Sequence, residues 1–322
     1  MKRASSAKVD LSIVVPVYKE ELNILPFLDR LVPVIAKISK SSEIIFVLDP
    51  SPDNTEKVIM DCSASNSDIK LVKMSRRFGQ PAATIAGLAF SKGQRVVVID
   101  VDLQDPPELI LELDKKMSEG FDVVYATRRT REGETFFKRV FAKFGYKVIN
   151  SLSDVQIPKN TGDFRMMSSR VVKEICALNE KHGFLRGLVA YVGFNQTGVL
   201  YNRDSRHAGN GNYNRYLGSL RIGINGLVGF SAKPLNFMSI FGGVVALFSF
   251  LLGGWYGIQK ILGMNLTPGL STSVILISFF AGIQLLSLGL LGEYVSRIYD
   301  EVKNRPMYIV EKTTGFDEQQ SV

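Results

Sequence analysis

Short apolar runs rich in β-branched residues alternate with amphipathic stretches along the N-terminal part of the chain. A run of this length fits one buried strand, and the apolar spacing between runs fits helices that pack on one side. The expected strands are Ser12–Val17, Glu43–Leu48, Ile69–Met74, Arg95–Asp100 and Asp122–Ala126, and the expected helices are Glu21–Ile38, Asn54–Ser63, Pro81–Ser91 and Pro107–Glu119. Such alternation predicts an α/β domain with a Rossmann-like, doubly wound and mostly parallel sheet.

Two long uncharged runs follow in the C-terminal part of the chain, Leu235–Ile258 with 24 residues and Leu270–Gly292 with 23. At a rise of about 1.5 Å per residue, each is long enough to cross a hydrocarbon core about 30 Å thick. The alternative is a pair of buried core helices, but such helices normally end after about 10–14 residues. We therefore predict a hairpin of two transmembrane helices.

The charges around these runs indicate an orientation. Arg221 and Lys233 precede the first run and Arg297 and Lys303 follow the second, whereas the loop between the runs carries only Lys260. Positive flanks favour the cytoplasmic side. The polar N-terminus has no signal-peptide pattern. We expect a multi-pass inner-membrane protein whose large domain and both termini are cytoplasmic.

The chain thus divides into four parts. We expect a cytoplasmic domain over residues 1–212, a membrane-surface helix over 213–234, the two spans over 235–292 and a cytoplasmic tail over 293–322. The surface helix is predicted because apolar and basic residues alternate there beside the first span, although an ordinary solvated helix has a similar pattern. Gly253 and Gly257 have a spacing that lets membrane helices approach closely, which permits a homo-oligomer.

Composition narrows the chemistry. The net charge of +8 favours anionic partners such as phosphates, nucleic acid or a lipid surface. Two cysteines and two histidines in 322 residues nearly exclude a zinc cage and make a disulfide framework improbable. Basic and aromatic residues mix in Phe136–Tyr146, but no RNA-binding motif accompanies them, so we expect no nucleic-acid partner.

The strongest local signal is the segment Asp100-Val-Asp-Leu-Gln-Asp-Pro-Pro-Glu108, which follows a buried strand. Ligands of open α/β sheets bind beyond the carboxyl ends of the strands. Asp100 and Asp102 can both reach one hard cation there, and Mg²⁺ or Mn²⁺ uses one or two carboxylates together with substrate phosphates. The pattern favours a metal–diphosphate site. The alternative is a loop or capping aspartate, and for Asp105 we expect a helix cap.

Four segments in order resemble family 2 glycosyltransferases: Val15-Pro-Val-Tyr-Lys-Glu-Glu-Leu-Asn-Ile24, Asp49-Pro-Ser-Pro-Asp53, Asp100–Glu108 and Gly162-Asp-Phe-Arg165. Together with the hairpin they are similar to polyprenyl-phosphate glycosyltransferases, relatives of dolichol-phosphate mannose synthase, and above all to the bacterial GtrB type. The resemblance implies a GT-A fold, a nucleotide-sugar donor, a divalent metal and inversion at the anomeric carbon.

The resemblance also implies roles for single residues. Pro16, Tyr18 and Glu20 match the segment that holds the nucleotide, Asp49 the acid near the base, and Asp100, Asp102 and Gln104 the metal and diphosphate motif. Asp163 matches the acid near the acceptor, where a catalytic role and a structural one both stay open.

The chain departs from the family pattern around the nucleotide. Leu48 and Pro50 stand where an acid and a glycine are usual, and Lys19 and Arg77 stand where asparagines are usual. These departures concern the identity of the base more than the reaction.

The acceptor is expected to be a phosphate. The second pKa of a phosphate is near ~6, so a lipid phosphate needs no strong base. Guanidinium groups suit it better than histidine. The candidate ligands are Arg128, Arg131 and Lys138 in one basic group and Arg206 in another. A solvated surface role is the alternative for any single one of them.

The sequence therefore predicts a metal-dependent, membrane-bound enzyme that transfers a hexose to a polyprenyl phosphate such as undecaprenyl phosphate. The expected donor is UDP-glucose. GDP-mannose or a modified-sugar donor is the alternative within this class. A catalytically silent, membrane-anchored nucleotide-binding protein is the alternative outside it.

Overall fold

The computed structural model describes residues 9–129, 158, 160–178, 180–181, 184–203, 231–263 and 269–316. The chain forms two compact units. The first comprises Met1–Lys147, Val155–Gly218 and Pro306–Val322, and the second comprises Val148–Asp154 and Ser219–Arg305.

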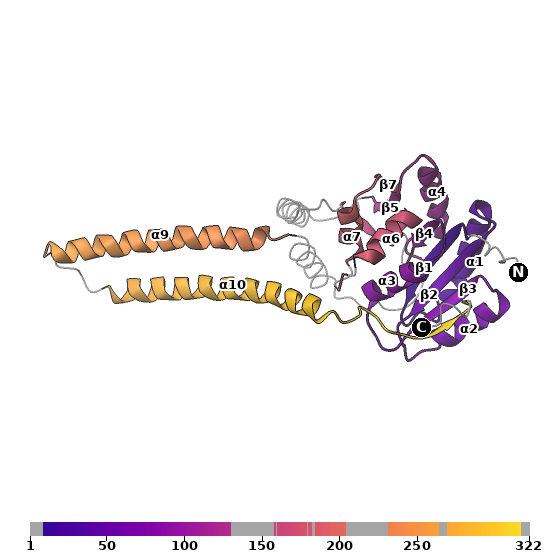
Figure 1. The fold of residues 1–322 in the computed structure, drawn as a ribbon, viewed down its shortest axis with the longest axis horizontal. Coiled ribbons are helices and arrows are strands. Elements are labelled where there is room, and N and C mark those ends of the chain that lie inside the picture. The colour runs from indigo at the N-terminus through magenta and orange to yellow at the C-terminus, as the bar shows by residue number, and fades with distance from the viewer. Residues whose placement is uncertain are drawn as a thin grey trace, which may run out of the picture. The chain divides into compact units, whose positions relative to one another are not determined.

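The first unit is built on an eight-stranded sheet with the order β7-β5-β6-β4-β1-β2-β3-β8. Figure 1 labels strands β1–β5 and β7 of this sheet. Its strands are β1 (Leu11–Val17), β2 (Ser42–Leu48), β3 (Ile69–Met74), β4 (Arg95–Val98), β5 (Val123–Arg128), β6 (Thr161–Ser168), β7 (Gln196–Tyr201) and β8 (Val310–Thr314). Strands β4, β1, β2 and β3 pair in parallel, as do β5 and β7, whereas β6 and β8 are antiparallel to their neighbours. The prediction of a mostly parallel α/β sheet is confirmed.

Helices cover both faces of this sheet. They are α1 (Ile24–Ile38), α2 (Thr55–Ser65), α3 (Gln80–Phe90), the short 3₁₀ turn η1 (Pro107–Leu109), α4 (Ile110–Ser118), α6 (Ser169–Ala177) and α7 (Leu185–Val192). Helices α1, α2 and α4 share one core with Phe46, whereas α3 packs against Ile45 and Val47 on the other face. Because successive side chains of a strand point to opposite faces, a strand covered on both sides is apolar throughout.

Helix α3 approaches the sheet so closely that one position requires glycine. A Cβ built on Gly87 would lie 2.3 Å from Cγ1 of Val14 and 2.9 Å from Cγ2 of Val47. No side chain fits there without displacing β1 or β2. The loop before α3 is thereby held close to the ends of these strands.

The second unit contains two long helices, α9 (Lys233–Ile261) and α10 (Leu270–Lys303). Both contain apolar stretches long enough to cross a membrane, and no part of these stretches is buried within the described structure. Phe250 is 79% exposed and Ile261 is 87% exposed. Such exposure argues against core helices of a water-soluble globule, because exposed apolar patches of this size mark contact with another apolar phase.

The segment after Gly292, which we expected to be a tail, is divided between a helix and a strand. Helix α10 continues to Lys303, aided by an ion pair of 3.2 Å between Arg297 and Glu293 one turn apart. Residues 310–314 then form β8, which pairs with β3. The expected surface helix over 213–234 lies outside the described residues except for its last four.

Candidate active site

Six segments bring polar side chains to one edge of the sheet. Strands β1, β2, β4, β5 and β7 end at this edge, and the antiparallel β6 begins there. Arg165 of β6 lies opposite Val98, the last residue of β4, and Asp163, two residues before Arg165, is close enough to Asp100 to raise the pKa of its carboxyl group. Tyr18, Asp49 and Asp100 follow β1, β2 and β4. The edge therefore collects acids from segments far apart in the sequence.

A tight turn presents Asp102 after β4. The Asp102 carboxylate accepts a hydrogen bond of 3.1 Å from the N–H of Gln104. Leu103, between them, has a φ of 58°, in the left-handed region that costs a side-chain-bearing residue about 1–2 kcal/mol. The Leu103 side chain is buried in the core, which offsets this cost. The hydrogen bond to Gln104 and the buried Leu103 side chain thus fix the position of Asp102.

Asp100 lies in an excess of negative charge. Burial raises the pKa of its carboxyl group to about 8, and the carboxylates of Asp163, Asp102 and Asp105 add to the effect, while Arg203 opposes it. Gln80 Nε2 donates a hydrogen bond of 2.8 Å to Asp100 Oδ1. A group of carboxylates that repel one another in this way is stabilised by a cation.

The donor set fits a hard divalent cation. Oxygen ligands of this kind suit Mg²⁺ or Mn²⁺. Within the described ranges, no group of three or more histidine, cysteine or carboxylate side chains converges closely enough to hold an ion alone. A site that phosphate oxygens of a substrate complete needs only one or two carboxylates, and Asp100 and Asp102 are the residues that would hold such an ion.

Asp163 is paired with an arginine that the sequence analysis missed. Arg186, on the first turn of α7, donates from Nε to Asp163 Oδ1 at 3.0 Å. Burial would raise the pKa of Asp163, but the charges of Arg186 and Arg165 outweigh it and hold this pKa below its usual value. Asp163 is therefore a carboxylate and not an acid at neutral pH.

Asp105 is the centre of a second cluster and not the helix cap that we expected. Its carboxylate accepts a hydrogen bond from the Tyr201 hydroxyl and lies 3.4 Å from Arg203 Nε and 3.7 Å from Arg128 Nη2. The cap position of η1 is Pro106, which has no side-chain donor or acceptor. Burial, and then Asp105, raise the pKa of Tyr201 to about 12, so this hydroxyl stays protonated.

Arg128, one of the candidate residues for binding the acceptor phosphate, belongs to this cluster, and the other candidates lie in segments that the structure does not describe. Arg128 also donates from Nε to the Tyr201 hydroxyl at 3.1 Å. Arg131, Lys138 and Arg206 lie outside the described residues. Arg203 was part of a basic segment in the sequence but was not singled out, since nothing in the chain indicated its approach to Asp105.

The expected nucleotide side of the site is built by β1 and β2. Pro16 lies within β1 and is buried opposite Val47. The Glu20 carboxylate accepts a hydrogen bond from Asn23 Nδ2. Asp49 is 3% exposed and accepts hydrogen bonds from the N–H groups of Phe78 at 2.9 Å and Gly79 at 2.8 Å. Asp49 thus fastens the loop before α3.

Comparison with known proteins gives the family. Residues 12–176 match the family model described as Glycosyl transferase family 2. An uncharacterized glycosyltransferase of Synechocystis sp. is 43% identical over 310 residues, which cover 96% of this chain and 97% of that protein. The chain belongs to glycosyl transferase family 2. It is therefore a glycosyltransferase with a GT-A fold, as the resemblance implied.

Two further likenesses concern a full-length relative and a solved structure. The SfII prophage-derived bactoprenol glucosyl transferase of Shigella flexneri is 38% identical to this glycosyltransferase over 304 residues, which cover 94% of this chain and 98% of that one. Glucosyl-3-phosphoglycerate synthase of Mycobacterium tuberculosis is 20% identical, with a TM-score of 0.47 over 69% of this chain and 80% of that one.

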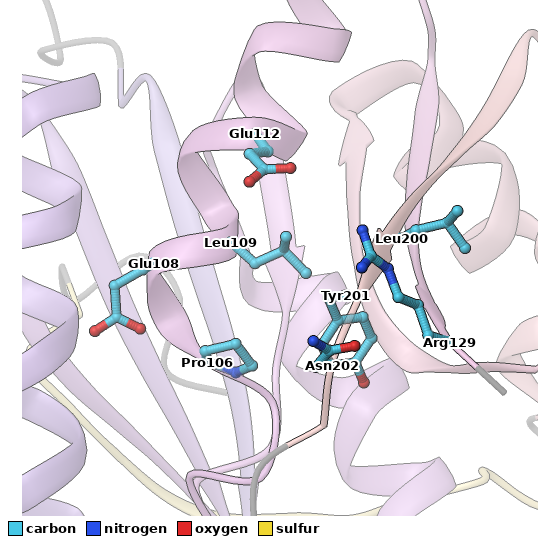
Figure 2. Close-up of a pocket in the computed structure, with 8 residues that line it drawn as sticks. All are labelled: Pro106, Glu108, Leu109, Glu112, Arg129, Leu200, Tyr201 and Asn202. Atoms are coloured by element: carbon cyan, nitrogen blue, oxygen red, sulfur yellow. The ribbon is translucent and has the colours of Figure 1, made fainter. Parts of the chain in front are cut away.

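The glycosyltransferase domain contains a cavity of about 300 Å³, and Asp100, Asp102 and Asp163 are not among the residues that line it (Figure 2). It is lined by Pro106, Glu108, Leu109, Glu112, Arg129, Leu200, Tyr201 and Asn202. Two glutamates beside one arginine do not suit an anion. Tyr201 lines the cavity and also donates a hydrogen bond from its hydroxyl to Asp105.

Proposed function

We propose that this glycosyltransferase is a membrane-bound inverting enzyme that transfers glucose from UDP-glucose to a polyprenyl phosphate, such as undecaprenyl phosphate. The observation that carries the proposal is the set of acids at the carboxyl edge of the sheet, where Asp100 has a pKa of about 8. The relative named as a bactoprenol glucosyl transferase, similar over nearly its whole length, supports the acceptor and the sugar.

The donor diphosphate belongs beside Asp100, Asp102 and Gln104. Asp100 and Asp102 would hold a Mg²⁺ or Mn²⁺ ion there, which would supply positive charge to offset the charge that develops on the leaving diphosphate. The turn at Leu103 keeps Asp102 in place. Pro16, Tyr18, Glu20 and Asp49 form the nucleotide side of the pocket.

The acceptor needs orientation more than deprotonation. A phosphate monoester with a second pKa near ~6 is mostly dianionic at neutral pH and can attack without a strong base. Asp163 is ionised and tied to Arg186, so its role is to orient the sugar or acceptor and to stabilise positive charge at the anomeric carbon. Arg128, Arg131, Lys138 and Arg206 bind the acceptor phosphate.

The helices α9 and α10 anchor the enzyme in the membrane that contains its acceptor. Their apolar surfaces are exposed, and the positive flanks support a cytoplasmic location for the catalytic domain and both termini. A phosphate on a polyprenyl chain stays in the plane of the bilayer. An anchored site therefore meets it by lateral diffusion.

The test is transfer by the purified full-length protein in phospholipid vesicles. The vesicles contain undecaprenyl phosphate, and radiolabelled UDP-glucose is added with Mn²⁺. We expect label in the lipid phase, identified by mass analysis as a glucosyl polyprenyl phosphate, and none when the acceptor or the metal is omitted.

Parallel reactions contain labelled GDP-mannose and other common sugar nucleotides. A faster reaction with one of these would replace glucose as the donor sugar while keeping the acceptor. Absence of labelled lipid with every donor would refute the proposal. Retention of the label on a water-soluble product would refute the lipid acceptor.

A further inference from the structure

The β3–α3 loop, residues 75–79, and Gln80, the first residue of α3, contact residues at the ends of three neighbouring strands. Arg77 lies on the ring of Tyr18 after β1, with Cζ 4.0 Å from the ring centroid. Phe78 and Gly79 donate their N–H groups to Asp49 after β2. Gln80 donates from Nε2 to Asp100 after β4. The loop and the first residue of α3 thus contact three residues that the resemblance assigns to the donor site.

The loop is fixed at both ends. At its start, the N–H of Ser75 donates to the carbonyl of Ile309, just before β8, at 2.9 Å. At its end, Gly79 has a φ of 93°, a left-handed conformation that favours glycine and that aims its N–H at Asp49. Since both ends are fixed, Arg77 in the middle has a defined position over Tyr18.

Two adjacent arginines of this loop stack on different aromatic rings. Arg76 has its Cζ 4.0 Å from the centroid of Phe78, the same distance that separates Arg77 from Tyr18. Both arginines are exposed, and among the described residues neither forms an ion pair with a carboxylate. A guanidinium held over a ring by a cation–π contact still has N–H groups available to donate to acceptors at its rim. Only Arg77 stacks on a residue of the expected donor site.

The order of the strands indicates which part of a donor meets Arg77. The diphosphate belongs beside Asp100 and Asp102, after β4. From there the order is β4-β1-β2-β3, with neighbouring strands about 4.8 Å apart. A nucleotide that extends along this edge passes Tyr18 and Asp49 and then reaches the loop that leaves β3. The base, at the opposite end from the diphosphate, is the part nearest the loop.

We propose that Arg77 is a donor-specificity residue whose guanidinium, held on Tyr18, donates hydrogen bonds to carbonyl oxygens of the donor's nucleobase. The inference rests on the proposed function, because it requires a nucleotide-sugar donor. Asp49 then acts on the base indirectly, through the loop that it fastens. Arg77 stands where the resembling family commonly has asparagine, so the contact belongs to this chain's own departure from the pattern.

The test is calorimetric titration of the full-length protein in detergent with two probes, UDP and inorganic pyrophosphate, each in the presence of Mn²⁺. Arg77→Met removes the N–H donors but keeps an unbranched side chain. We expect this variant to bind UDP roughly 10-fold or more weakly, since a charge-assisted hydrogen bond is lost, and to bind pyrophosphate as the wild type does. Arg76→Met, the matched control, removes an equal charge from the same loop and should change UDP affinity less than about 2-fold.

Arg77→Lys is the second variant. It keeps the charge but lacks the planar fork, so it should stay weakened toward UDP, and it decides the question if the methionine variant does not fold. Wild-type UDP affinity in Arg77→Lys, or in a folded Arg77→Met, would overturn the inference. Equal losses for UDP and pyrophosphate, or equal losses in the Arg76 and Arg77 variants, would also overturn it. A wild-type protein that binds no nucleoside diphosphate would instead refute the proposed function itself, and the inference with it.

Discussion

Asp102 stands at the turn after β4, where its carboxylate can reach a cation that Asp100 shares. We expect Asp102→Asn to lower transfer by roughly 10²-fold or more, because a neutral amide binds a divalent cation and offsets the developing charge poorly. The measurement is initial transfer rate together with Mn²⁺-dependent UDP binding. Asp61→Asn, an exposed position on α2, is the control and should keep both. Full activity in the Asp102 variant would remove this residue from the metal site.

The ion pair between Asp163 and Arg186 controls a protonation state. Burial favours the neutral form of Asp163, so loss of the Arg186 charge should raise this pKa. With a higher pKa, the Asp163 carboxylate becomes protonated at a higher pH when the solution is acidified. In Arg186→Gln we therefore expect the acidic limb of the pH–rate profile to shift to higher pH, and in Arg186→Lys we expect a smaller shift. An unchanged limb in the glutamine variant would show that the ionised form of Asp163 is not required.

The distance along the chain between interacting residues explains which residues of the site could be predicted from the sequence. Asp100, Asp102 and Gln104 lie in one short segment after an apolar strand, and a general rule about strand ends locates them. The residues that pair with Asp163 and Asp105 are instead distant in the sequence: Arg186 is 23 positions from Asp163, and Tyr201 is 96 positions from Asp105. Only the folded sheet shows these pairings, so Asp105 was mistaken for a helix cap.

At the scale of elements, periodicity located the first five strands and four helices to within a few residues. Strand β4 ends at Val98 and not at Asp100, because the chain leaves the sheet to form the turn at Leu103. Strands β6, β7 and β8 were not predicted. Their sequences mix polar and apolar positions, as in Thr161–Ser168, and their neighbours in the sheet are distant in the chain.

A buried carboxylate joins three strands at the opposite edge of the sheet from the site. Glu43 at the start of β2 is 1% exposed, accepts hydrogen bonds from Ser12 and from the N–H of Lys92, and pairs with Lys70 at 2.7 Å. We expect Glu43→Ala to lower the free energy of unfolding by about 3–5 kcal/mol, because the buried partners lose their counter-charge and acceptor.

Denaturant unfolding of the detergent-solubilised full chain measures this loss. Glu119→Ala breaks an exposed pair of the same kind, with Lys116 at 2.7 Å, and should change stability by less than about 1 kcal/mol. Similar effects of the two substitutions would show that the Glu43 network contributes no more than a surface ion pair.

At the scale of the whole molecule, composition was enough to indicate the two long helices, because length and absence of charge are local properties. Anchoring of the site in the membrane, as we propose, leads to a kinetic prediction. When the protein is reconstituted into vesicles with increasing amounts of phospholipid at constant total acceptor, the transfer rate should fall with the mole fraction of polyprenyl phosphate in the bilayer, since local concentration governs the encounter. A rate that follows only the total acceptor concentration would contradict a membrane-resident reaction.

The return of the chain to β3 after α10 has a consequence for the integrity of the enzyme. The last strand, β8, is hydrogen-bonded to β3 through paired residues from Leu71 to Met74, although most of the second unit separates them in sequence. A protease that hydrolyses one peptide bond between 219 and 305 would therefore leave two fragments still held by that ladder. The two fragments should therefore copurify under native conditions and separate only when the protein is denatured.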